Sequence, residues 1–204
     1  MNAILNRFRD VIRVEIHGGE PFLAPIENLY EVWKKVSPLW PNIHWSCSTN
    51  LTYNLTEEHL KFFKEVFTKG FCTSWDKSIR FSNQKQEDLW RENLRTLVNE
   101  GHNITLNVSL NRELLEMNTD ELVNWLNTLG VNYVQFERLT YDGSALQNMD
   151  IFPLNIGFFK IYRKLDLGET PEMNDLFVGF RGHYFFLFAI DIHLEFLHSL
   201  CAGR

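Results

Sequence analysis

The sequence reads ITLNVSL from Ile104 to Leu110 and VNYVQFERL from Val131 to Leu139, and these two runs decide the fold. Both alternate apolar and polar residues, which is typical of β-strands. The segment between them has the pattern of a helix that Thr119 caps and Gly130 ends. Its apolar positions recur at helical spacing: Leu122, Val123, Leu126 and Leu129. A strand, a helix and a second strand in this order predict two parallel strands joined by a crossover.

The same unit recurs toward the N-terminus. Strands are predicted at Val11–His17, Asn42–Ser48 and Phe71–Ser74, and helices at Ile26–Val36, from Thr56 to Gly70, and at Lys85–Glu100. The Thr56 helix begins with two acidic residues and the last two helices end at glycines. About five strands separated by about four helices predict an α/β fold with a parallel sheet, either open or curled into part of a (β/α) barrel.

Composition excludes several classes of protein. The 204 residues carry 20 Lys and Arg against 26 Asp and Glu, a net charge of −6, with 14% aromatic residues. So much apolar surface argues against disorder, and an acidic chain with no basic run argues against a nucleic-acid binder. The first residues contain no apolar stretch long enough for a signal peptide, so we expect a cytoplasmic protein.

The C-terminal part differs from the rest. We divide the chain into a (β/α) domain over residues 1–150 and an atypical extension over residues 151–204. Within the extension, Phe177–Leu200 is rich in Phe, Leu and Ile, but charged residues and histidines interrupt it. A membrane span needs roughly 20 apolar residues in a row, so none is predicted. The extension is expected to be an irregular apolar tail that either contacts a partner or derives from a shifted reading frame.

Candidate ligand-binding residues follow the predicted strands. In parallel α/β folds ligands bind at the carboxyl ends of the strands. The residues found there are Gly18, Gly19, Glu20 and Pro21 after the first strand, Asn50 after the second, Ser74, Asp76 and Arg80 after the third, and Gln135 and Glu137 in the fifth. Adjacent glycines expose backbone to a ligand, Glu20 suits an ammonium group, and the polar set with Arg80 suits hydroxyls and a carboxylate. A tight turn with Pro21 opening a helix is the purely structural alternative.

Taken together, the blocks resemble the radical S-adenosylmethionine (SAM) superfamily. From about Val11 to Ala145, VEIHGGEP is similar to the second barrel strand and its GGE loop, SCSTNLTYNLTEEHLKFF to the third strand, and FCTSWDKSIRF to the fourth. ITLNVSLNREL and LGVNYVQFERLTYDGSA resemble the fifth and sixth strands. The resemblance implies a partial (β/α) barrel that binds SAM through the candidate residues, with the GGE loop holding the methionine amino group.

The resemblance also implies a [4Fe–4S] cluster, which the family holds with a Cys-x3-Cys-x2-Cys loop after the first barrel strand. The cysteines of this chain, Cys47, Cys72 and Cys201, lack that spacing, and the chain begins at about the helix that should follow the loop. We therefore expect a truncated barrel, inactive on its own in radical modification of a peptide or small molecule. No catalytic residue and no metal ligand is assigned.

Two other functions stay open. The first is a non-catalytic interaction module, in which a partner protein binds the open sheet edge or the aromatic tail. The second is a different α/β enzyme that uses Glu137 or Asp76 as a general acid or base.

Overall fold

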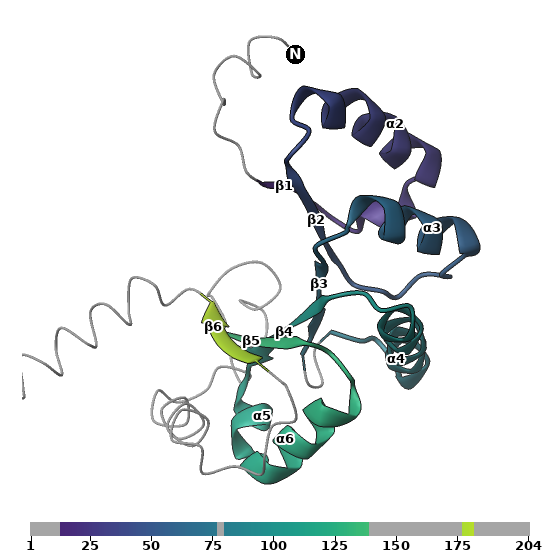
Figure 1. The fold of residues 1–204 in the computed structure, drawn as a ribbon. Coiled ribbons are helices and arrows are strands. Elements are labelled where there is room, and N and C mark those ends of the chain that lie inside the picture. The colour runs from purple at the N-terminus through teal and green to yellow at the C-terminus, as the bar shows by residue number, and fades with distance from the viewer. Residues whose placement is uncertain (1–12, 77–79, 139–176, 182–204) are drawn as a thin grey trace, which may run out of the picture.

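A computed structural model describes residues 13–76, 80–138 and 177–181, in which strands and helices alternate (Figure 1). The strands are β1 (Arg13–Ile16), β2 (His44–Thr49), β3 (Phe71–Trp75), β4 (Ile104–Leu110), β5 (Tyr133–Arg138) and β6 (Phe177–Arg181). The α-helices are α2 (Ile26–Val36), α3 (Glu57–Val66), α4 (Gln84–Asn99), α5 (Arg112–Glu116) and α6 (Thr119–Thr128). The described residues also contain two short 3₁₀ turns, η1 (Pro21–Leu23) and η2 (Ser37–Leu39).

The six strands form one sheet in the order β1-β2-β3-β4-β5-β6, and every neighbouring pair is parallel. This confirms the predicted α/β class. The sheet is open, with β1 and β6 at its two ends, so its belonging to part of a barrel stays a prediction. Strand order equals chain order, so each crossover leads to the next strand along.

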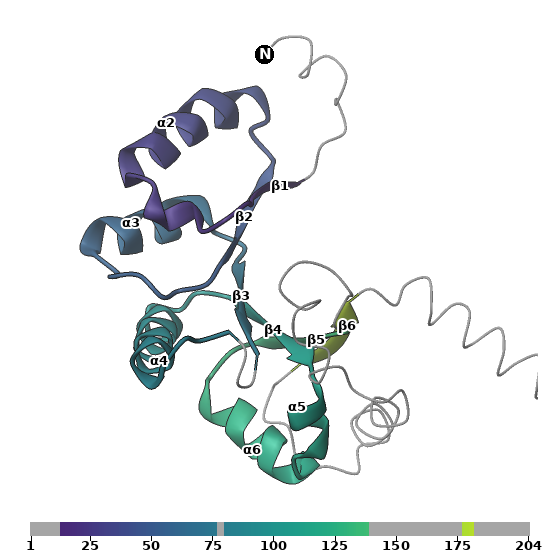
Figure 2. The same cartoon turned by 180° about the vertical axis from the view of Figure 1, so that it is seen from behind.

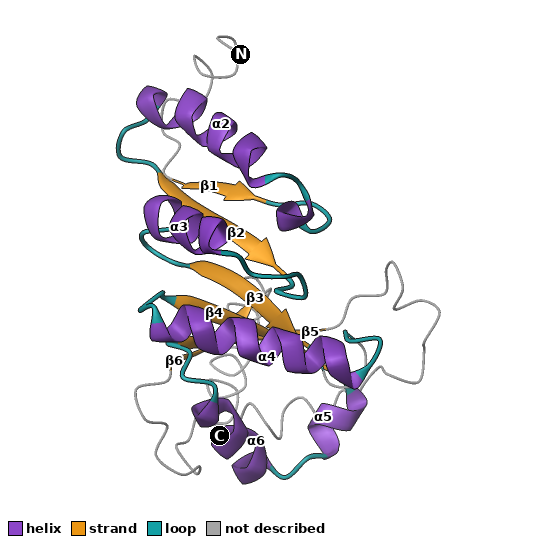
Figure 3. Ribbon diagram, turned by 90° about the vertical axis from the view of Figure 1, so that its right-hand side faces the viewer, coloured by secondary structure: helices purple, strands orange, loops and turns teal. Residues whose placement is uncertain are grey.

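One face of the sheet is apolar and lies under the helices. In β4, Ile104, Leu106, Val108 and Leu110 are buried on this face, whereas Thr105, Asn107 and Ser109 point to the other face. Figures 1 and 2 show α2, α3 and α4 along the same side of the strands, and Figure 3 looks onto that side. The opposite face is polar, which is unusual for a parallel sheet.

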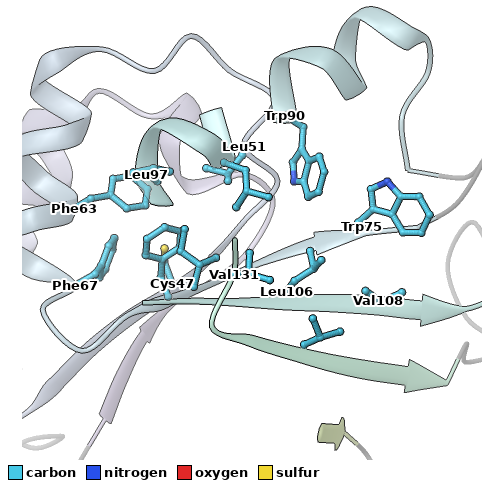
Figure 4. Packing of buried hydrophobic residues seen from close by; sticks show 14 of the residues in the cluster. Cys47, Leu51, Phe63, Phe67, Trp75, Trp90, Leu97, Leu106, Val108 and Val131 are labelled. Atoms are coloured by element: carbon cyan, nitrogen blue, oxygen red, sulfur yellow. The ribbon is translucent and has the colours of Figure 1, made fainter. Parts of the chain in front are cut away.

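The hydrophobic core fills the space between the apolar face and the helices. Figure 4 shows Trp90 and Leu97 of α4 and Phe63 of α3 gathered beside strand residues such as Leu106. Trp90 and Phe63 have no exposed surface. Full burial of side chains of this size stabilises the fold by about 1.5–3 kcal/mol each.

Caps and glycines set where the helices begin and end. Thr56 caps α3, with its hydroxyl accepting from the His59 backbone, as predicted. The cap of α6 is Asn118 rather than Thr119, because the Asn118 carboxamide accepts from Asp120 and leaves Thr119 as the first helical residue. After α4, Gly101 takes a positive φ of 82° that favours glycine.

The C-terminal extension contains a regular strand. Residues 177–181 (FVGFR) form β6 and pair in parallel with β5, so the prediction of an irregular tail was wrong for these residues. Their aromatic and β-branched composition favours a strand. The proposed boundary at residue 150, and the rest of the extension, lie outside the described residues. In the described part of the chain, no helix is long and apolar enough to cross a membrane.

Candidate functional site

The Gly18–Gly19 turn lies directly after β1, at the carboxyl edge of the sheet. Gly18 has a φ of 109° and Gly19 a φ of 55°, both in the region that L side chains rarely adopt. A Cβ added at either position would meet no atom within 4 Å. The backbone groups of this turn therefore face open space, and a ligand can approach them closely.

The Glu20 carboxylate fastens this turn to the loop after β2. One carboxylate oxygen, Oε2, accepts from the Asn50 backbone N–H at 2.6 Å. The other, Oε1, accepts from the Thr49 hydroxyl at 2.8 Å and from the Phe22 backbone N–H at 3.2 Å. These three bonds use most of the capacity of the carboxylate, whose two oxygens can accept about four hydrogen bonds, so Glu20 holds the turn in place whether or not a ligand also reaches it.

The residues around Glu20 also make contacts within the protein that shape these two loops. Pro21 is buried and opens the 3₁₀ turn η1, as the structural alternative predicted. The Asn50 side-chain oxygen accepts from the backbone and the hydroxyl of Thr52 at 2.9 and 2.8 Å, which shapes its own loop. The Thr49 hydroxyl also lies 3.3 Å from the Tyr53 hydroxyl. Burial raises the pKa of Tyr53, so its phenol stays protonated.

A second group forms after β3 around Asp76. The Asp76 Oδ2 accepts from Arg80 Nε at 2.6 Å, and its Oδ1 accepts from the Ser109 backbone N–H at 3.2 Å. Asp76 is 7% exposed, whereas the Arg80 side chain is 30% exposed. The carboxylate thus ties the end of β3 to the end of β4 and aims a partly accessible guanidinium.

The remaining predicted residues lie on the polar face of the sheet. Ser74 is aligned with Asn107 of β4, and Asn107 with Gln135 of β5, so the three form a row across three strands. Glu137 is aligned with Ser109 two positions further on. Sequence analysis missed Asn107, which is 5% exposed and whose Oδ1 has no hydrogen-bond partner. The alternation in ITLNVSL was the signal, because it places Asn107 on the face opposite to the apolar residues, in the same row as Ser74 and Gln135.

The two groups stay separate. Within the described residues, no hydrogen bond joins the Glu20 group to the Asp76 group. Asp76 also lines a cavity of about 440 Å³ on the helical side, beside Trp75, Trp125 and Arg91. There the two indole rings have centroids 4.3 Å apart, and Arg91 lies 5.7 Å from the centre of the Trp125 ring. This aromatic cavity is the alternative place for a planar ligand.

The described cysteines do not fit an iron–sulfur cluster. Cys47 has no exposed surface, and burial raises the pKa of its thiol well above the usual value. Cys72 is partly buried, and Cys201 lies outside the described residues. In residues 13–76, 80–138 and 177–181, no three His, Cys, Asp or Glu side chains gather into a metal-binding group.

Comparison with known proteins supports the fold. No protein-family model and no curated protein matches the chain. Among solved structures, a domain of pyruvate-formate lyase-activating enzyme from Bacteroides vulgatus ATCC 8482 is similar, with a TM-score of 0.57 and 17% sequence identity. The match covers 83% of this chain and 98% of that domain. At this identity the likeness establishes a shared fold.

Proposed function

We propose that this chain is a radical-SAM-type domain that binds S-adenosylmethionine at the carboxyl ends of its strands. The observation that carries the proposal is the open Gly18–Gly19 backbone, held in place by the Glu20 carboxylate. The fold shared with a domain of an activating enzyme supports it independently.

The contacts follow from the groups that are still accessible. Carbonyl groups of the Gly18–Gly19 turn would accept from the SAM ammonium group, with the turn held by the three hydrogen bonds of the Glu20 carboxylate. Arg80 would donate to the SAM carboxylate, and the Ser74 hydroxyl would contact the ribose. Glu20 and Asp76 then act as positioning residues rather than as direct ligands of SAM.

Radical chemistry needs a cluster that the described residues do not hold. A [4Fe–4S] cluster with bound SAM supplies a 5′-deoxyadenosyl radical in this superfamily. The sequence contains no Cys-x3-Cys-x2-Cys motif, and the described residues offer no group of three ligands. Radical modification of a peptide or small molecule would therefore require cluster ligands beyond those in the described residues.

Calorimetric titration with SAM, combined with iron analysis after anaerobic reconstitution, tests the proposal. We expect SAM binding without stoichiometric iron. Replacing Arg80→Gln should weaken SAM binding about tenfold, because a charge-assisted bond is lost. Arg91→Gln is the matched control, since both arginines pair with a carboxylate four residues away and are 30% and 35% exposed.

Each outcome decides a different point. Binding that R91Q weakens and R80Q leaves unchanged would move the ligand to the aromatic cavity and overturn the assigned contacts. Stoichiometric iron would overturn the statement that the chain lacks a cluster. Absence of SAM binding would overturn the proposed function.

A non-catalytic interaction module is the second candidate. In the described residues β1 pairs only with β2, so one side of β1 offers unpaired backbone groups. Three large apolar side chains that follow β1 in the sequence are exposed, Leu23 (76%), Val32 and Leu39. An interaction module predicts self-association or partner binding that Leu23→Ser abolishes, with SAM binding absent. Sedimentation of the L23S variant and of the unmodified chain distinguishes the two candidates.

A further inference from the structure

A second cavity lies at the amino ends of the strands, on the polar face and at the edge opposite to the Gly18–Gly19 turn. Its volume is about 410 Å³. It is lined by the first residues of four strands, Arg13, His44, Phe71 and Tyr133. The same cavity is lined by residues beside the start of β4, among them Thr105. Because all strands are parallel, their amino ends meet at this one edge.

The lining is cationic. Arg13 and Lys69 both line the cavity, and none of the described lining residues is a carboxylate. Glu15 approaches Arg13 from beyond the lining, at 3.3 Å, and the Arg13 guanidinium also donates to the Ser46 hydroxyl at 3.1 Å. One of the two positive charges is thus partly balanced, and the charge of Lys69 has no ion pair among the described residues.

His44 stands between these charges with an unsatisfied ring nitrogen. Its Nε2 is buried and has no hydrogen-bond partner. Burial lowers the pKa of His44, and the charges of Arg13 and Lys69 lower it further, while a hydrogen bond to the Gly70 backbone acts in the opposite direction. The other titratable groups that line the cavity are Cys72 and Tyr133. An anion in the cavity would offset the charges of Arg13 and Lys69 and so raise the pKa of His44.

We propose that this cavity binds the phosphate or carboxylate group of a small anionic molecule, with Lys69 and Arg13 as donors and His44 as the titratable group beside them. A volume of about 410 Å³ is within the range of small-molecule pockets. Hydroxyl groups of Ser46 and Thr105 line the same cavity and supply further donors. The site lies at the opposite end of the strands from the Gly18–Gly19 turn, although Gln135, which also lines it, is aligned through Asn107 with Ser74.

Histidine ring signals in NMR spectra of the full chain test the proposal. The His44 signal is assigned as the one missing from His44→Gln, and is followed against pH with inorganic phosphate or with chloride at equal ionic strength. We expect saturable binding of phosphate and a rise in the pKa of His44. Lys69→Gln should weaken binding at least about tenfold, whereas Lys61→Gln, which removes one charge from the exposed side of α3, should leave it unchanged.

The source of the anionic group is decided by parallel titrations with phosphate and with succinate. Tighter binding of either one names the class and supports the site. A pKa of His44 that is the same in phosphate, succinate and chloride would overturn the proposal. An equal response of K69Q and K61Q would do the same, because it would show charge screening rather than a site. Circular dichroism of each variant shows that the fold is retained.

Discussion

Removal of the Glu20 carboxylate tests whether it fastens the Gly-Gly turn to the loop after β2. Glu20→Ala deletes the acceptor of three hydrogen bonds, from the Asn50 backbone at 2.6 Å, the Thr49 hydroxyl at 2.8 Å and the Phe22 backbone at 3.2 Å. The two backbone donors lose this acceptor, while the Thr49 hydroxyl keeps its contact with Tyr53. The perturbation is therefore mainly the loss of two charge-assisted bonds to backbone N–H groups.

The magnitude follows from those two bonds. A hydrogen bond to a charged group contributes about 1.5–3 kcal/mol when buried, and partial exposure reduces this toward the lower end. We expect E20A to lower the free energy of unfolding by about 2–3 kcal/mol. In a chain of this size that corresponds to a fall in Tm of about 4–12 °C. Glu20→Gln keeps the shape of the side chain but turns its amide NH₂ toward one of the two backbone N–H donors. It should therefore lower the free energy of unfolding by about 1–2 kcal/mol.

Urea unfolding followed by tryptophan fluorescence measures these differences. Glu31→Ala is the matched control, because Glu31 pairs with Lys35 at 3.1 Å on the exposed side of α2, with side chains 70% and 65% exposed. Such a surface pair contributes about 0.5 kcal/mol or less. An E20A variant within about 0.5 kcal/mol of the unmodified chain, or equal to E31A, would refute the role of Glu20 in holding the turn.

Three further predictions concern the scaffold. Gly70→Ala should lower the free energy of unfolding by more than about 2 kcal/mol, since φ is 111° and the new Cβ would collide with the Asn103 carbonyl oxygen. Gly101→Ala, where φ is 82° but the space is open, should lower the same free energy by only about 1 kcal/mol in the same urea assay. Asn93→Asp should lose about 2–4 kcal/mol in thermal unfolding, because the buried Asn93 amide donates to two loop carbonyls at 2.9 and 2.8 Å that a carboxylate would repel. Burial lowers the pKa of His102 below 6.5, so the folded state binds fewer protons than the unfolded state, and the free energy of unfolding must fall as pH drops below about 6.5. His102→Gln should therefore reduce the fall in the urea midpoint between pH 7.5 and 5.5. A midpoint that falls equally in H102Q and in the unmodified chain would contradict this prediction.

Local sequence patterns were sufficient for most of the fold. The predicted bounds of β4 and α2 agree with the structure, and the other elements differ by a few residues at their ends. These elements are encoded by the periodicity of apolar residues, which depends on neighbours in the chain. The helix α5 (Arg112–Glu116) and the 3₁₀ turn η2 (Ser37–Leu39) were missed because elements of one or two turns have too few residues for a period to show. The strand β6 was missed because composition alone was considered there.

The candidate site was predictable in position but not in its bonding. Strand ends could be located from the sequence, so the Gly18–Gly19 turn and Asp76 were found at the carboxyl edge. What each carboxylate contacts depends on pairing between distant strands. Glu20 reaches Asn50, 30 residues away in the chain, and Asp76 reaches Ser109, 33 residues away. Neither contact has a sequence signal, and each joins the loop after one strand to a neighbouring strand end.

The polar face of the sheet connects the two proposals. Parallel sheets are usually apolar on both faces, because helices cover both. Here the apolar burial lies on the helical face, while β2 places His44, Ser46 and Ser48 on the other. Polar side chains there add little hydrophobic stabilisation, and both proposed sites use them as hydrogen-bonding groups. From His44 to Thr49 the strand rises roughly 17 Å, which is too far for one phosphate or one ammonium group to reach both ends. The two proposed sites can therefore be tested separately, and the loss of one leaves the evidence for the other intact.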